Sequence, residues 1–165
     1  GFGSAGIKNT IEKRLTNLNN NKENKILCCW RNSNNDYQDY RERKELTKIE
    51  NKLFVQYHKL ATNEFWNMLD KYKFTLCPLG NGLDTAPKII ECLFLKSVPI
   101  CKRNPNTRRL YNKYPVLWVD DWKEINQDLL DNEGNDLYEI LKNNTYLTNF
   151  KIKTILNSIR NGRDI

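Results

Sequence analysis

Apolar residues fall into short runs separated by longer stretches in which they recur every three or four positions. Four of the short runs are bounded by polar or turn-forming residues, which is typical of strands buried in a sheet. They cover residues 25–30, 74–77, 98–101 and 115–119. We therefore expect a strand at each of these places.

The stretches between these runs have the spacing of helices that bury one face. They cover residues 7–18, 41–60, 63–72, 87–95, 106–112, 122–130, 138–141 and 146–159. Pro87 suits a first helical turn, where its missing N–H costs little, and Asp120-Asp121 is typical of a helix N-cap. The polar residues 31–40 predict a loop.

Strands that alternate with helices are typical of βαβ units, in which right-handed crossovers place helices on both faces of a parallel sheet. The sequence therefore predicts an α/β fold: a Rossmann-like parallel sheet of four to six strands. We expect residues 1–24 to be a linker or cloning remnant with an N-terminal helix, and residues 25–165 to form the Rossmann-like domain. The opening Gly1 to Gly6 spells GxGxxG, but no strand precedes it, so a linker is favoured there.

The chain is basic, with a formal net charge of +7 and a sequence pI near 9.1. Positive charge favours anionic partners, such as nucleic acid or phosphorylated ligands, but a lysine-rich solvated surface explains it equally well. Consecutive basic residues never reach a block of five, so a basic tail for nucleic acid is not expected. Hydrophobic residues make up 39%, which suffices for one core.

The cysteines give no metal-binding pattern, because no CxxC pair occurs and His58 is the only histidine. We expect them to be free buried thiols in a protein of the cytoplasm or another reducing compartment. They are Cys28, Cys29, Cys77, Cys92 and Cys101. No apolar stretch approaches the roughly 20 residues of a membrane span, so none is expected.

Candidate chemistry follows the predicted strands, because ligands of open parallel sheets bind beyond the carboxyl ends of the strands. Arg31 follows the first strand, and Lys102 and Arg103 follow the third. The loop after the second strand has glycines that let the backbone approach a ligand, and the next helix offers N–H groups to a phosphate. Its candidate residues are Gly80, Asn81, Gly82, Asp84 and Thr85.

Two further candidates lie in that helix. Lys88 would add a positive charge in its first turn, and Glu91, three residues on, could accept hydrogen bonds from the two hydroxyls of a ribose. The simpler alternatives are a tight turn at the glycines, a helix cap at Asp84, a solvated Arg31 and a surface ion pair between Lys88 and Glu91. The residue types alone leave both interpretations open.

An ordered string of residues resembles the signature of exostosin-type glycosyltransferases. It runs FTLCPLGNGLDT over residues 74–85, KIIECL over 88–93 and VPI over 98–100, and the similarity extends from Phe65 to Ile125. The segment with PVL at 115–117 and DW at 121–122 is also similar to the family, and residues 41–44 are a weaker match. The family usually has Arg where Lys88 stands, and Gly in the turn that is Lys96-Ser97 here.

This resemblance implies a GT-B type enzyme with two facing Rossmann-like halves, of which the carboxyl-terminal half binds a UDP- or GDP-linked sugar. By the same resemblance Glu91 binds the ribose, Lys88 contacts the diphosphate, and the loop of Gly80 to Gly82 faces the diphosphate and the sugar. The nucleotide sugar is the substrate, so no cofactor or metal is implied. The acceptor would be a hydroxyl of a glycan or a protein.

The resemblance also implies that the acceptor site and a general base belong mostly to a second domain of a longer chain. We therefore expect this chain to be the donor-binding half only, with its catalytic residues unassigned. Two alternatives stay open: a non-catalytic basic module that binds nucleic acid or a phosphorylated partner, and a degenerate glycosyltransferase domain kept as a scaffold. A carboxylate such as Glu91 would matter only for a sugar donor.

Overall fold

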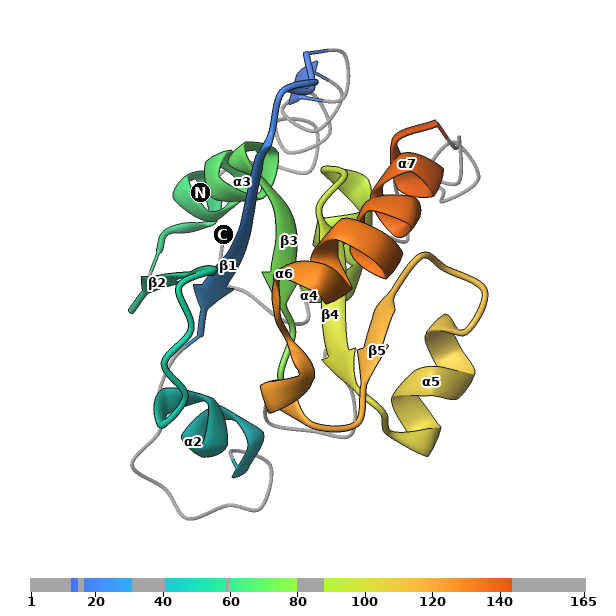
Figure 1. Ribbon diagram of the computed structural model, residues 1–165. Helices are drawn as coiled ribbons and strands as arrows, with labels where there is room; N and C mark the ends of the chain where they lie inside the picture. Colours follow the sequence, from blue (N-terminus) through green and yellow to red (C-terminus); the bar gives the residue numbers. More distant parts are fainter. Residues whose placement is uncertain (1–12, 15–16, 31–40, 59, 80–87, 144–165) are drawn as a thin grey trace.

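The computed structural model describes residues 13–14, 17–30, 41–58, 60–79 and 88–143. Five parallel strands form one sheet in the order β2-β1-β3-β4-β5 (Figure 1). The strands are β1 (Glu23–Cys29), β2 (Phe54–Tyr57), β3 (Tyr72–Leu76), β4 (Val98–Lys102) and β5 (Leu117–Val119). The predicted α/β fold with a parallel sheet is confirmed.

The helical segments alternate with these strands. Among the described residues after β1, the α-helices are α2 (Arg41–Thr47), α3 (Thr62–Lys71), α4 (Lys88–Phe94), α5 (Pro105–Tyr111), α6 (Gln127–Leu129) and α7 (Asn135–Asn143). A 3-10 turn, η2 (Trp122–Glu124), and a π-helical turn, η3 (Leu130–Gly134), complete them. The predicted helix over 7–18 lies mostly outside the described residues, and the loop over 31–40 and the helix over 146–159 lie wholly outside them.

The prediction of one helix over residues 41–60 is wrong. The helix ends at Thr47, and β2 forms from Phe54 to Tyr57 by pairing in parallel with Ile26–Cys29 of β1. Apolar residues at helical spacing are present, but the segment Phe-Val-Gln-Tyr also has high strand propensity, and the backbone of β1 offers it hydrogen-bond partners. Tertiary pairing therefore decides the structure of this segment.

The prediction of a continuous helix over 122–130 is also wrong. Asp121 does act as an N-cap: its side chain accepts from Lys123 N (2.9 Å), and the Glu124 side chain accepts from Asp121 N (2.8 Å). This capping box starts only a 3-10 turn. The Asn126 side chain then accepts from Leu129 N and starts a new helix. A second cap close to the first interrupts the helix.

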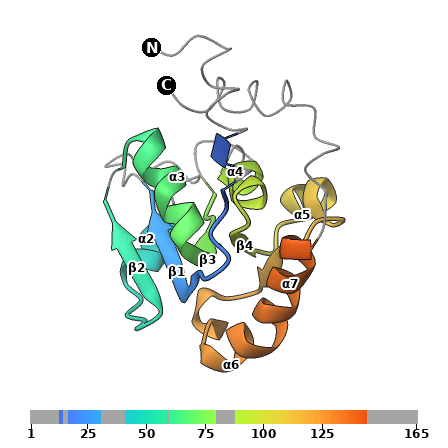
Figure 2. The same cartoon turned by 90° about the horizontal axis from the view of Figure 1, so that it is seen from above.

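Helices cover both faces of the sheet. Figures 1 and 2 place α7 on one face of the strands and α4 on the other. On the α7 side the backbone of η3 comes close to β3: a Cβ on Gly134 would lie 2.9 Å from Cε1 of the buried Phe74 ring. Only glycine fits this contact without displacing the ring.

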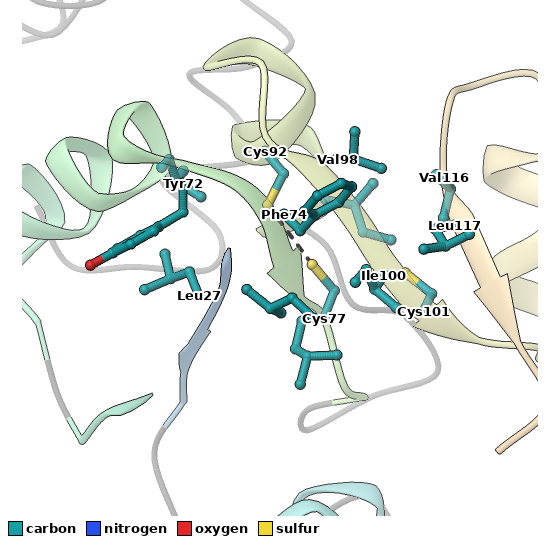
Figure 3. Close-up of a cluster of buried hydrophobic side chains, with 14 of the residues drawn as sticks. Leu27, Tyr72, Phe74, Cys77, Cys92, Val98, Ile100, Cys101, Val116 and Leu117 are labelled. Atoms are coloured by element: carbon teal, nitrogen blue, oxygen red, sulfur yellow. Dashed lines mark hydrogen bonds between the residues drawn. The ribbon is translucent and has the colours of Figure 1, made fainter. Parts of the chain in front are cut away.

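The core is centred on β1, β3 and β4, and Figure 3 shows part of it. The side chains of Leu27, Phe74 and Ile100, one from each of these strands, are fully buried. Sulfur atoms of Cys77 and Cys92 point toward one another across the junction of β3 and α4, at 3.8 Å. All five cysteines are buried and none is in a disulfide bond, as predicted.

The turn from α4 to β4 has a backbone that usually needs glycine. Lys96 adopts a φ of 62°, while Ser97 N donates to Cys92 O (2.9 Å) and Lys96 N donates to Leu93 O (3.4 Å). These two bonds form the Schellman motif, whose left-handed residue is most often glycine. The resemblance expects glycine in this turn, and Lys96 takes the same conformation with a side chain.

Candidate functional site

The sheet reverses its winding between β1 and β3. From β1 the chain adds β2 on one side and then returns to add β3 on the other, followed by β4 and β5 (Figure 1). At such a switch point the connections leave the carboxyl ends of the two strands in opposite directions, which opens a crevice where ligands bind. Two of the sequence-predicted groups follow these ends but lie outside the described residues. They are Arg31 and the loop residues Gly80, Asn81, Gly82, Asp84 and Thr85.

Lys88 lies at this switch point, at the first residue of α4. Its side chain is buried, and Nζ donates a hydrogen bond to the carbonyl of Cys29, the last residue of β1. Nζ also lies 5.8 Å from the ring centroid of Phe65 on α3. A carbonyl and an aromatic face both stabilise an ammonium away from water. Lys88 therefore joins the start of α4 to the end of β1.

Glu91, one turn further along α4, faces α3. It is 2% exposed, and its Oε2 accepts a hydrogen bond from Trp66 Nε1 at 2.6 Å. The guanidinium of Arg14 lies over the Trp66 ring, 5.7 Å from the centroid. Because Glu91 and Lys88 are both buried, the alternative of a surface ion pair between them is wrong.

Trp66, which donates a hydrogen bond to Glu91, is a residue of the candidate site that sequence reasoning missed. Its place on the apolar face of a predicted helix marks it only as a core residue, and it is indeed 4% exposed. A buried indole usually finds a partner for its N–H, which is the one general signal that could have suggested a polar neighbour. The identity of that neighbour, Glu91, depends on how α3 and α4 pack.

Helix α2 holds the chain where it leaves β3. Glu42 Oε2 accepts from Leu79 N at 2.9 Å, and Arg43 Nε donates to Leu79 O at 3.1 Å. Burial raises the pKa of the Glu42 carboxyl, while the Leu79 N–H and the nearby Lys102 act in the opposite direction. The sequence had indicated residues 41–44 only as a weak similarity.

The two basic residues at the end of β4 have carboxylate partners. Lys102 Nζ lies 3.3 Å from Glu45 Oε2 of α2, and Arg103 pairs with Asp120, which follows β5. Both pairs are partly exposed to solvent. The structure thus brings Lys102 and Arg103 to the same edge of the sheet as Lys88. Lys102 and Arg103 each form an ion pair with an acidic side chain at this edge.

A second buried lysine lies at the opposite edge, in the segment expected to be a linker or helix. Lys22 directly precedes β1, is 5% exposed, and donates from Nζ to Leu69 O (2.8 Å) and to Leu95 O. Desolvation by burial lowers the pKa of its amine to about 7. Nothing in the sequence distinguishes Lys22 from the other lysines of the chain.

Comparisons with known proteins do not identify the chain: no protein-family model matches it, and neither does any curated protein. The similarity to exostosin-type glycosyltransferases therefore rests on the residues quoted above. Within the described residues, no group of three or more His, Cys, Asp or Glu side chains could hold a metal ion. None of the helices described is both long enough and apolar enough to cross a membrane.

Proposed function

We propose that this chain is the donor-binding domain of a glycosyltransferase and that it binds a nucleoside-diphosphate sugar at the carboxyl edge of its sheet. One observation carries the proposal. The segment that resembles the glycosyltransferase signature leaves β3 at the switch point between β1 and β3, and Lys88 from the same segment contacts the end of β1. Nucleotides bind at this place in doubly wound parallel sheets.

In this proposal, different residues bind different parts of the donor. Lys88 supplies positive charge for the diphosphate, aided by Arg31 and the glycine loop, and Lys102 and Arg103 add charge at the rim of the site. Glu91 binds the ribose by sharing its carboxylate between Trp66 Nε1 and the ribose hydroxyls, since a carboxylate has about four acceptor positions. The positive groups would stabilise the diphosphate as it departs.

A second domain would bring the acceptor hydroxyl to the sugar, and closing the two domains would orient the reacting groups. The chain described here contributes binding and electrostatic stabilisation to that reaction. The proposal therefore predicts nucleotide binding by this chain, whereas transfer of the sugar needs the second domain.

Calorimetry with UDP, GDP and their sugars tests the proposal. We expect at least one of them to bind with a dissociation constant of about 1 mM or less. Glu91→Gln keeps the size of the side chain but removes its charge, so it should weaken binding about tenfold. Glu139→Gln is the matched control, because Glu139 is an exposed carboxylate on α7, and it should leave binding unchanged.

Two results would contradict the proposal. One is the absence of binding to every nucleotide at millimolar concentration in a sample that circular dichroism shows to be folded. The other is salt-sensitive binding to random oligonucleotides that Glu91→Gln leaves intact, which would instead support a basic module for nucleic acid. Loss of a carboxylate weakens the binding of a ribose but does not weaken binding to an anionic chain.

A further inference from the structure

Helix α2 stands in an unusual place for a crossover helix. It connects β1 to β2, and helices in such connections normally pack on a face of the sheet. Figure 1 shows α2 beyond the arrowheads of the strands, on the side of their carboxyl ends. Its buried Leu46 anchors it, and its polar residues contact the exits of β3 and β4.

The contact with the exit of β3 involves both polar groups of one residue. Cys77 N donates to Ile100 O (2.9 Å), which continues the sheet bonding one residue beyond β3. Two residues later, the N–H of Leu79 donates to the Glu42 carboxylate and the C=O of Leu79 accepts from the Arg43 guanidinium. Hydrogen bonds with one ionised partner are shorter and stronger than neutral ones.

We propose that Glu42 and Arg43 are positioning residues for the donor site, because they fix Leu79 at the point where the signature segment leaves the sheet. The inference rests on the proposed function, in which the residues that follow Leu79 face the donor. Neither side chain needs to touch the donor for this role. Their effect on donor binding acts through the backbone of Leu79.

This arrangement makes the donor site sensitive to acid. Protonation of Glu42 replaces a charge-assisted hydrogen bond from Leu79 N–H with a weaker neutral one. Among the described residues, the charged groups around Glu42 are Arg43 and Glu45 on its own helix and Lys102 at the end of β4. Burial raises the pKa of Glu42, so the weakening begins at a higher pH than for an exposed glutamate.

The backbone contact is tested first, and independently of any ligand. The amide proton of Leu79 is followed by NMR from pH 4 to pH 8 in the wild type, in Glu42→Gln and in Glu50→Gln. We expect its chemical shift to titrate in the wild type and in Glu50→Gln, the control with an exposed carboxylate, and to stay constant in Glu42→Gln. A shift that does not titrate, or that titrates alike in all three proteins, overturns the inference.

Donor affinity is tested next, with whichever nucleotide binds the wild type. Glu42→Ala should weaken binding about tenfold, because it removes the acceptor of Leu79 N–H. Glu42→Gln should bind the nucleotide with an affinity within about threefold of the wild type at pH 7.5, since its amide oxygen still accepts a hydrogen bond. The same variant should flatten the pH profile of binding. A purely structural role for Glu42 would change folding stability without changing that profile.

The two proposals fail in distinguishable ways. If the wild type binds a nucleotide and Glu42→Ala binds it equally well with the same pH profile, the positioning role is wrong and the proposed function stands. If Leu79 titrates as expected but no nucleotide binds the folded wild type, the donor site is wrong and Glu42 only holds the backbone. Arg43→Lys serves as a second variant: it keeps the charge but replaces the guanidinium, and should also weaken binding.

Discussion

Two buried lysines, Lys22 and Lys88, lie at opposite edges of the sheet. Lys22 precedes β1 at the amino edge and donates to Leu69 O near the end of α3 and to Leu95 O just after α4. Lys88 lies at the carboxyl edge and donates to Cys29 O at the end of β1. Both Nζ groups donate to backbone carbonyls, although lysine side chains usually extend to the solvent.

The difference between the two edges lies in what surrounds each lysine. At the amino edge, Lys22 donates to carbonyls at the ends of two helices, and Lys96 Nζ donates to Leu141 O (2.8 Å) in the last turn of α7. At the carboxyl edge, Lys88 lies at the switch point of the sheet, beside the segments that carry the candidate site residues. The lysines of the amino edge thus bind the ends of its own helices, and the carboxyl edge is where we propose that the ligand binds.

The largest expected effect concerns the thiols near the carboxyl edge. Burial raises the pKa of Cys28 and of Cys77 above the ordinary value of 9.0. Above that pH the unfolded chain loses these protons and the folded protein keeps them. The free energy of unfolding should therefore fall as pH rises, by about 1.4 kcal/mol per pH unit for each thiol.

Urea unfolding at several pH values between 8 and 10.5, with a reductant present, measures this slope. Cys28→Ala and Cys77→Ala should each have a shallower slope than the wild type above pH 9, by the contribution of one thiol. If the free energy of unfolding of each variant changed with pH in parallel with that of the wild type, these thiols would titrate alike in the folded and unfolded states. The constant offset between the curves reports the methyl-sized packing change and not the titration.

At the amino edge, the pH dependence of the free energy of unfolding has the opposite sign. The pKa of Lys22 is lowered to about 7, so between pH 7 and its ordinary value of 10.5 the unfolded chain binds more protons than the folded protein. Stability from this group therefore rises with pH. We expect the free energy of unfolding of the wild type, relative to Lys22→Met, to increase by about 2 kcal/mol from pH 7 to pH 9.

Taking the difference between the two proteins removes the thiol contribution, which both share. Lys25→Met is the matched control, because Lys25 Nζ also donates to a backbone carbonyl, that of Lys52, but at an exposed site. A difference between the wild type and Lys22→Met that stays constant from pH 7 to pH 9 would mean that Lys22 keeps its charge throughout this range. Nucleotide affinity at the carboxyl edge should be the same in both variants.

The smallest effect concerns the amino-edge turn at Lys96. Lys96→Gly and Lys96→Ala both lose the bond from Nζ to Leu141 O, so their difference reports only the backbone at a φ of 62°. Lys96→Gly should be the more stable by about 1 kcal/mol, because a Cβ is unfavourable in the left-handed region. Urea unfolding at pH 7 measures this difference, and equal stabilities would show that the turn relaxes in one of the variants.

Local patterns were sufficient for most of the fold. The apolar runs at 25–30, 74–77 and 98–101 predict β1, β3 and β4 to within a few residues, because strands buried on both faces have few polar positions. Local patterns failed at Phe54–Tyr57, where helical spacing and strand propensity coincide. Pairing with β1 makes this segment a strand. A local pattern holds no information about which backbone will be available for pairing.

The candidate site was predicted less completely than the fold. Residue types and spacing indicated Lys88, Glu91, Lys102 and Arg103, all of which the structure describes. The partners of these residues come from elsewhere in the chain: Trp66 for Glu91, Cys29 for Lys88 and Glu45 for Lys102. Contacts between residues so far apart in sequence arise from packing and have no local signal.

The sequence by itself determined that the chain forms a parallel α/β sheet and that the segment after β3 carries the residues typical of a ligand site. Tertiary structure alone decided the strand order, which places the switch point between β1 and β3, and the burial of Lys22 and Lys88. The physical reason is that hydrophobic periodicity depends on neighbours in sequence. The environment of a charge depends on every element packed around it, and so it is fixed only when the whole domain has assembled.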